Sequence, residues 1–62
     1  MMTIAANIAR LRRVQGLTQE ALAERIGVSG QTVSKWETEA TWPDVTLLPS
    51  IADVFGVTVD AL

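Results

Sequence analysis

The stretch LTQEALAERIGVSGQTVSKWE, residues 17–37, decides how this chain is expected to fold. It contains two amphipathic patterns, residues 18–26 and 30–37, separated by three residues that begin with Gly27. Apolar side chains recur three or four residues apart in both patterns, which is the spacing of a buried helix face. A hydroxyl residue stands at the start of each pattern, where it can cap a helix, and Gly27 can end the first one. We therefore expect two short helices joined by a tight turn.

Apolar periodicity outside this stretch predicts three further helices. They span residues 3–15, 45–55 and 58–62, and the alternating pattern of a β-strand is nearly absent. Gly16 and Gly56 follow the first two of these helices, at the position where a helix ends most easily. The expected fold class is all-α, a compact five-helix bundle. All 62 residues are expected to form a single domain, either complete or the first part of a longer protein.

The positive charge of the chain is confined to its first half, although the net charge is −2. Residues 1–35 carry all five cations and two carboxylates, whereas residues 36–62 carry five carboxylates and no cation. A polyanion would therefore have to approach the side formed by the first half. On charge alone, the alternative that these groups only keep a small domain in solution stays open.

The composition excludes several classes of protein. The absence of cysteine and histidine excludes a disulfide, a thiolate metal site and a histidine general base. No apolar run approaches the roughly 18 residues that a membrane span requires, and no secretory signal is visible. We expect a cytoplasmic protein with no membrane partner.

Catalysis is not expected from this sequence. It has no glycine-rich phosphate loop, no nucleophile beside a base and no cluster with metal-ligand spacing. Glu20 and Glu24 stand one turn apart on a helix, which is more typical of a solvated surface than of a catalytic pair. We therefore expect no enzyme activity, no cofactor, no metal ion and no small-molecule ligand.

The two patterns of residues 17–37 match the helix-turn-helix motif. This motif needs a first helix, a tight turn with a glycine, and a second helix with a polar exposed face. In the second helix, Val33 and Trp36 are expected to face the core. The opposite face carries a polar stripe with one cation and no carboxylate, formed by Gln31, Ser34, Lys35 and Thr38. The pattern favours a helix-turn-helix over an ordinary helical hairpin.

Four segments of the chain together closely resemble the phage-repressor-like helix-turn-helix family (Cro, lambda repressor and xenobiotic-response-element type). They are LTQ-x-x-LA, VS-x-QTVSKWE, PD-x-x-x-LP-x-IA and FGV-x-VD-x-L, and they cover nearly the whole chain. The resemblance implies a five-helix fold and a DNA-binding transcription regulator. It also implies double-stranded DNA as the partner, the helix at about residues 30–37 in the major groove, and binding as a homodimer on DNA.

The resemblance further implies which residues contact DNA. Gln19 matches a glutamine that contacts the DNA backbone and sometimes a base, while Gln31 and Lys35 match positions that reach base edges. A glutamine can pair with both N6 and N7 of adenine, and a lysine can reach guanine. The start of the helix at residues 18–26 offers free N–H groups to a phosphate. The expected DNA-contacting residues are Thr18, Gln19, Ser29, Gly30, Gln31, Thr32, Ser34 and Lys35.

A structural ion pair is expected between Arg12 and Glu37. Glu37 projects close to Val33, on the inward side of its helix, where a lone carboxylate is costly. Arg12 borders the apolar stripe of the first helix, whereas Arg10 and Arg13 point away from it. The resemblance implies the same pair, so we expect Arg12 to stabilise the fold and not to contact bases.

Three features depart from the family pattern. Gly30 leaves the first position of the second helix without a side chain, either because glycine is simply tolerated or because it lets the helix press closer to the DNA backbone. Glu39 stands where many relatives have a glycine, so the turn after residues 30–37 is expected to close differently. The segment TEATWPD, residues 38–44, is acidic. Its Trp42 is expected to cover the core beside Pro43, with a place on a contact surface as the alternative.

These departures keep a second hypothesis open. The chain could be a protein-interaction or antitoxin-like module that keeps the fold and binds DNA weakly. Gly30 and the acidic second half of the chain favour this alternative, whereas the polar stripe and the positive first half favour a regulator.

Overall fold

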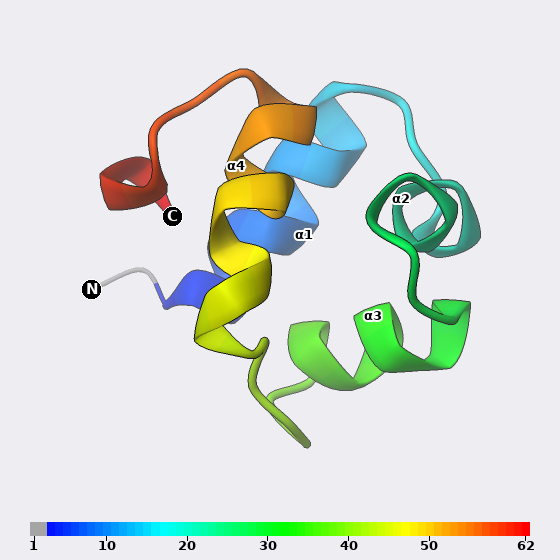
Figure 1. Cartoon of the computed structure of the whole chain (residues 1–62). Helices are drawn as coiled ribbons and strands as arrows, with labels where there is room; N and C mark the ends of the chain where they lie inside the picture. Colours follow the sequence, from blue (N-terminus) through cyan, green and yellow to red (C-terminus); the bar gives the residue numbers. More distant parts are fainter. Residues whose placement is uncertain (1–2) are drawn as a thin grey trace.

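The computed structural model describes residues 3–62, which form four α-helices and two 3-10 helices around one core (Figure 1). The helices are α1 (Ile4–Val14), α2 (Gln19–Ile26), α3 (Gly30–Glu37), η1 (Val45–Leu47), α4 (Leu48–Phe55) and η2 (Val59–Ala61). No strand forms within this part of the chain, which confirms the all-α class expected from the sequence. None of these helices is long and apolar enough to cross a membrane.

Side-chain caps fix where three of the α-helices begin. The hydroxyl oxygens of Thr3, Thr18 and Ser29 each accept a hydrogen bond from the backbone N–H three residues further on, at 3.1, 3.0 and 3.2 Å. Each bond satisfies one of the N–H groups that a helix leaves unpaired at its start. Gly27 and Gly56 end α2 and α4 with φ angles of 90° and 68°, a conformation that glycine adopts without steric cost.

The core takes side chains from all four α-helices. Ile8, Leu22, Val33 and Ile51, one from each of α1 to α4, are fully buried. Full burial of such a side chain stabilises the fold by about 1.5–3 kcal/mol, so each helix is anchored by its own residue. Trp36 is 3% exposed and belongs to this core, as the sequence predicted. The other buried apolar residues are Ala5, Ala23, Ala52 and Phe55.

The expected count of five helices is wrong. Residues 58–62 form only the 3-10 turn η2, held at its end by a hydrogen bond of 2.7 Å from Asn7 Nδ2 to the carbonyl oxygen of Leu62. The helix expected over residues 45–55 begins as the separate 3-10 turn η1, and α4 starts at Leu48. Pro49 explains this division, because a residue without an N–H fits the first turn of an α-helix but not its interior.

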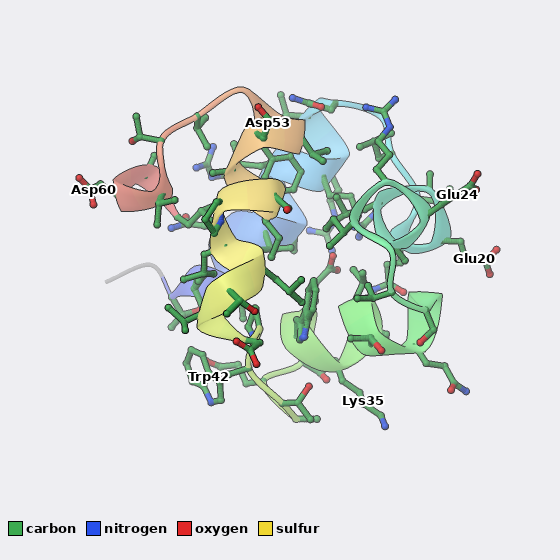
Figure 2. All side chains as sticks on the ribbon, viewed as in Figure 1. Glu20, Glu24, Lys35, Trp42, Asp53 and Asp60 are labelled. Carbon is green, nitrogen blue, oxygen red and sulfur yellow. The ribbon has the colours of Figure 1, made fainter. Side chains whose placement is uncertain are left out.

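The expectation that Trp42 covers the core is also wrong. Trp42 is 63% exposed, and Figure 2 shows its side chain projecting outward from the segment between α3 and α4. Trp36 from the last turn of α3, together with Leu47 and Leu48, already packs against the core beside this segment. The second tryptophan therefore has no buried position to fill.

The turn after α3 closes as it would with a glycine, contrary to the expectation for Glu39. Glu39 adopts a left-handed conformation with a φ angle of 63°. Its N–H donates to the carbonyl oxygen of Trp36 at 3.2 Å, and the N–H of Ala40 donates to that of Lys35 at 2.9 Å. These two bonds make a Schellman motif, which satisfies carbonyl groups at the end of a helix. A residue with a Cβ is strained in this conformation, so Glu39 holds some unfavourable energy.

Replacing Glu39 with glycine is therefore expected to stabilise the protein. The gain should be about 1 kcal/mol, the steric penalty of a left-handed residue with a Cβ. That gain corresponds to a rise in melting temperature of about 4–8 °C for a domain of this size. Glu39→Ala is the matched control, because it removes the same carboxylate and keeps the Cβ. Thermal unfolding followed by circular dichroism measures both, and an equal gain from alanine would contradict the strain.

Candidate nucleic-acid interface

The turn between α2 and α3 holds these two helices in one fixed arrangement. The N–H groups of Gly27 and Val28 both donate to the carbonyl oxygen of Ala23, at 2.8 and 3.0 Å. The side chains of Leu22 and Val33 are fully buried in the same core, one on each side of the turn. The outward face of α3 is therefore set by the packing of its inward face against α2.

This outward face carries the polar stripe expected from the sequence. Gln31 and Lys35, one turn apart, are exposed, while Thr32 and Ser34 beside them are partly exposed. Figure 2 shows the Lys35 side chain extending away from the body of the protein. The structure thus brings four of the expected DNA-contacting residues onto one helix surface, free of the core.

Thr18 and Ser29 lie at the starts of α2 and α3, where both serve as caps. The Ser29 hydroxyl accepts from the N–H of Thr32 and lies 2.9 Å from the Thr32 hydroxyl, so these two side chains form a local pair. The Thr18 hydroxyl accepts from the N–H of Ala21 and keeps its own hydrogen for another acceptor. Capping therefore leaves hydroxyl donors that can still meet a phosphate.

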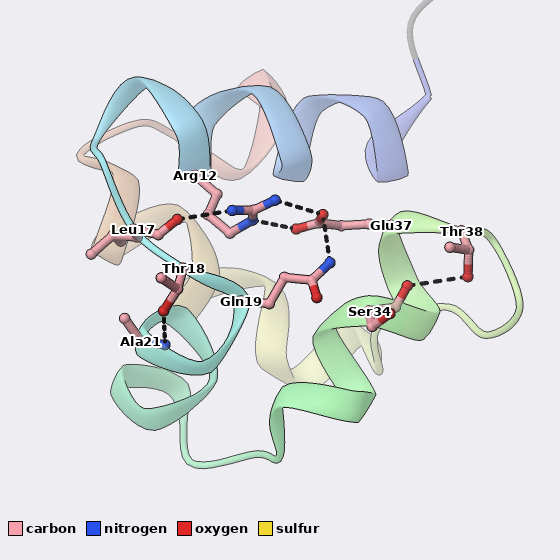
Figure 3. Close-up of polar contacts among 8 residues, drawn as sticks. All are labelled: Arg12, Leu17, Thr18, Gln19, Ala21, Ser34, Glu37 and Thr38. Carbon is pink, nitrogen blue, oxygen red and sulfur yellow. Dashed lines mark hydrogen bonds and ion pairs between the residues drawn. The ribbon is translucent and has the colours of Figure 1, made fainter.

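Gln19 has a partner inside the protein that the sequence analysis missed. Its Nε2 donates to Oε1 of Glu37 at 3.1 Å, and its side chain is half-buried (Figure 3). The amide group has two N–H donors, so one remains for a DNA phosphate. The signal in the sequence was the inward position of Glu37, because a buried carboxylate can accept from more than one donor, and here Oε1 accepts from both Arg12 and Gln19.

Arg12 and Glu37 form the ion pair expected from the sequence, with two parallel hydrogen bonds (Figure 3). Arg12 Nε donates to Glu37 Oε2 at 2.7 Å, and Arg12 Nη2 donates to Oε1 at 3.0 Å. Nη1 donates to the carbonyl oxygen of Leu17 at 2.9 Å. The two side chains are 12% and 6% exposed. One guanidinium therefore joins α1 to the end of α3 and to the segment that precedes α2.

The ion pair shifts the pKa of both partners away from their ordinary values. Burial alone would raise the pKa of Glu37, but hydrogen bonds from Arg12 and Gln19, together with the nearby positive charges, outweigh it and lower that pKa. The hydrogen bond with Glu37 raises the pKa of Arg12. Both groups are thus held in their charged forms in the folded protein.

Gly30 has a role that neither reading from the sequence anticipated. A Cβ at this position would lie 2.8 Å from Cγ of Glu20 and 3.5 Å from its Cα. The first distance is shorter than two carbon atoms tolerate, while the second is an ordinary contact. The missing side chain therefore lets the first turn of α3 approach the first turn of α2 with the Glu20 side chain between them.

A family model described as helix-turn-helix matches residues 8–62 of the chain. The chain is 42% identical over 55 residues to the helix-turn-helix-type transcriptional activator BcrR of Enterococcus faecalis. The matched region is 89% of this chain but only 27% of BcrR. It is 43% identical over 54 residues to the helix-turn-helix-type transcriptional regulator y4dJ of Sinorhizobium fredii, covering 87% of this chain and 70% of that protein.

Solved structures share this arrangement of helices. The P22 c2 repressor in complex with a synthetic operator superposes with a TM-score of 0.90 at 25% identity, over 97% of this chain and 91% of that one. A transcriptional regulator from Listeria innocua gives 0.86 at 31% identity, over 94% and 54% of the two chains. A cobalt(II) HppE chain solved with its substrate gives 0.81 at 31% identity, over 92% of this chain and 32% of that one.

The Glu37 pair makes the stability of the protein depend on pH. Because the pKa of Glu37 is lowered by folding, its stabilising effect is complete above the ordinary value of 4.5 and is lost as the pH falls through the lowered value. Wild type should therefore be more stable than Glu37→Gln at neutral pH, and the difference should shrink below pH 4.5. Melting temperatures across this range measure it. Glu24→Gln should keep the wild-type profile, and a difference that is constant with pH would argue against the pair.

The contact between Gly30 and Glu20 makes two substitutions interdependent. Alanine favours a helix over glycine by up to about 1 kcal/mol, but at Gly30 its Cβ must displace Cγ of Glu20. We expect Gly30→Ala to give no stabilisation in the wild-type background and a clear gain when Glu20 is also alanine. Denaturant unfolding of the two single variants and the double variant measures the coupling. Strictly additive effects would show that the two side chains do not compete for the same space.

Proposed function

The chain belongs to the helix-turn-helix family, whose model matches residues 8–62, and from this membership we propose that it is the DNA-binding module of a transcription regulator. The observation that carries the proposal is the exposed polar face of α3, held rigidly against α2. The likeness to the P22 c2 repressor, solved on an operator, supports a role for this face on double-stranded DNA. In the proposed complex α3 lies in the major groove.

Gln31 and Lys35 are proposed to read the bases. The Gln31 amide carries a donor and an acceptor, so it can pair with N6 and N7 of one adenine, which discriminates by about 1–3 kcal/mol against other bases. Lys35 lies one turn further along the same face and can donate to guanine or to a phosphate. Ser34 and Thr32 flank these two residues and can donate hydroxyl hydrogens to bases or backbone.

Thr18, Gln19 and Ser29 are proposed to position the module on the DNA backbone. Thr18 and Ser29 stand at the N-termini of α2 and α3, where backbone N–H groups and the helix dipole favour a phosphate. Gln19 keeps one N–H beyond the bond it makes to Glu37. Phosphate contacts of this kind fix orientation without reading sequence.

The module is proposed to bind as a homodimer on DNA. Few cations are present to displace counterions, so binding outside a specific site should be weak. Two copies on half-sites one helical turn apart, about 34 Å, would combine their contacts. Cytoplasmic location accompanies this role, since bacterial and phage operators lie there. Catalysis forms no part of the proposal; the HppE likeness covers only 32% of that chain.

A protein-interaction module is the second candidate function. Trp42 and Val45 are 63% and 73% exposed, and they stand close to Glu39 and Asp44 in an acidic segment. A salt series of mobility shifts separates the two candidates. Binding to a selected duplex that weakens steeply with salt supports the regulator, whereas no shift with any DNA at micromolar protein supports the interaction module.

Selection of bound sequences from a random duplex pool tests the proposal directly. Gln31→Ala should relax the base preference at one position of each half-site and leave the preferences at the other positions in place. Arg10→Ala is the matched control, because Arg10 lies on α1 and should affect affinity only, if it affects binding at all. An equal loss of affinity on every sequence for Gln31→Ala would contradict its reading role.

A further inference from the structure

The side chain of Glu20 occupies the space that the first residue of α3 leaves empty. The distance of 2.8 Å from Glu20 Cγ to a Cβ at Gly30 means that the Glu20 side chain runs where a side chain at residue 30 would begin. Glu20 comes from the first turn of α2, ten positions earlier in the sequence. Helix α2 therefore places a carboxylate beside the N-terminus of α3.

The carboxylate of Glu20 is available to a partner molecule. Glu20 is exposed, and within residues 3–62 its side chain makes neither a hydrogen bond nor an ion pair. Figure 2 shows it projecting outward beside the start of α3, while Glu24 projects from α2 one turn further from that point. The N-terminal residues of a helix in the major groove are those that contact base edges. Glu20 thus stands at the edge of the surface formed by Gln31 and Lys35.

An ionised carboxylate can only accept hydrogen bonds. In the major groove, cytosine presents the N4 amino group, a donor, and adenine presents its N6 donor beside the acceptor N7. Guanine presents N7 and O6 and thymine presents O4, all acceptors. A carboxylate pressed against guanine or thymine would face acceptors, and against the backbone it would face phosphate charge. Cytosine is the base whose edge it matches best.

We propose that Glu20 is a specificity-determining residue that accepts a hydrogen bond from N4 of a cytosine, in the place that a side chain at residue 30 would otherwise read. The assignment rests on the proposed function, because it requires α3 to lie in the major groove. The assignment also gives Gly30 a role in recognition, because the absence of a side chain there leaves room for the Glu20 side chain of α2. The same carboxylate disfavours guanine and thymine at this position, because it then meets only base acceptors. It disfavours adenine less, because the N6 donor lies beside the acceptor N7.

The test is sequence selection with wild type, Glu20→Ala and Glu20→Gln, each first shown to fold by circular dichroism. Wild type should prefer cytosine about tenfold at the base pair next to the position that Gln31→Ala relaxes. Glu20→Ala should lose this preference and keep the others. Glu20→Gln should change the preference from cytosine to adenine, because an amide pairs with N6 and N7 of adenine.

Glu24→Gln is the matched control, since it removes the same charge from the same helix one turn away. Both Glu24→Gln and Glu20→Gln remove one negative charge, so both should raise the affinity for all duplexes by a similar factor. Only Glu24→Gln should leave the cytosine preference intact. If Glu20→Ala selects the wild-type site, the assignment of Glu20 is overturned while the proposed function stands. If wild type selects no sequence at all, the proposed function itself is overturned, and the reading role of Glu20 with it.

Discussion

The contact among Arg12, Gln19 and Glu37 holds the end of α3, and with it the exposed face proposed to bind DNA, against α1 and α2. These residues come from α1, the start of α2 and the end of α3, so a single carboxylate is the point at which three helices meet. The core fixes α3 along its length, but the ion pair fixes the direction of its far end. Desolvation offsets much of the attraction within such a pair, but removal of one partner leaves the other charge buried and unpaired, so the two side chains are needed together. A change in its geometry would turn Gln31 and Lys35 together.

A chain of 62 residues has room for only one core, and three of the polar side chains described above serve two purposes. The Thr18 hydroxyl caps α2 and keeps its own hydrogen as a donor, while the Ser29 hydroxyl caps α3 and pairs with the Thr32 hydroxyl. The Gln19 amide braces Glu37 with one N–H and leaves the other. The groups that begin α2 and α3 therefore also lie beside the face of α3 that is proposed to contact DNA.

Much of this structure follows from the sequence, because its determinants are local. Apolar residues three or four apart predicted α1 to α3, hydroxyl caps added to the prediction of α2 and α3, and the inward position of Glu37 predicted its pairing with Arg12. The features that escaped prediction depend on tertiary placement. Trp42 is exposed because other side chains fill the core beside it, and Glu39 accepts a left-handed turn because the Schellman bonds hold it there. The contact of Glu20 with Gly30 arises from the crossing of two helices, which no local pattern encodes.

The opposite surroundings of the two tryptophans give the protein two built-in optical reporters. Indole emission shifts with the polarity around the ring, and Trp36 is shielded within the core while Trp42 stands in water between α3 and α4. Emission from Trp36 follows the integrity of the fold. Emission from Trp42 changes when a partner molecule binds to the segment between α3 and α4 and removes water from the indole ring. When either tryptophan is replaced by phenylalanine, the emission wavelength of the remaining one distinguishes unfolding from binding without any added label.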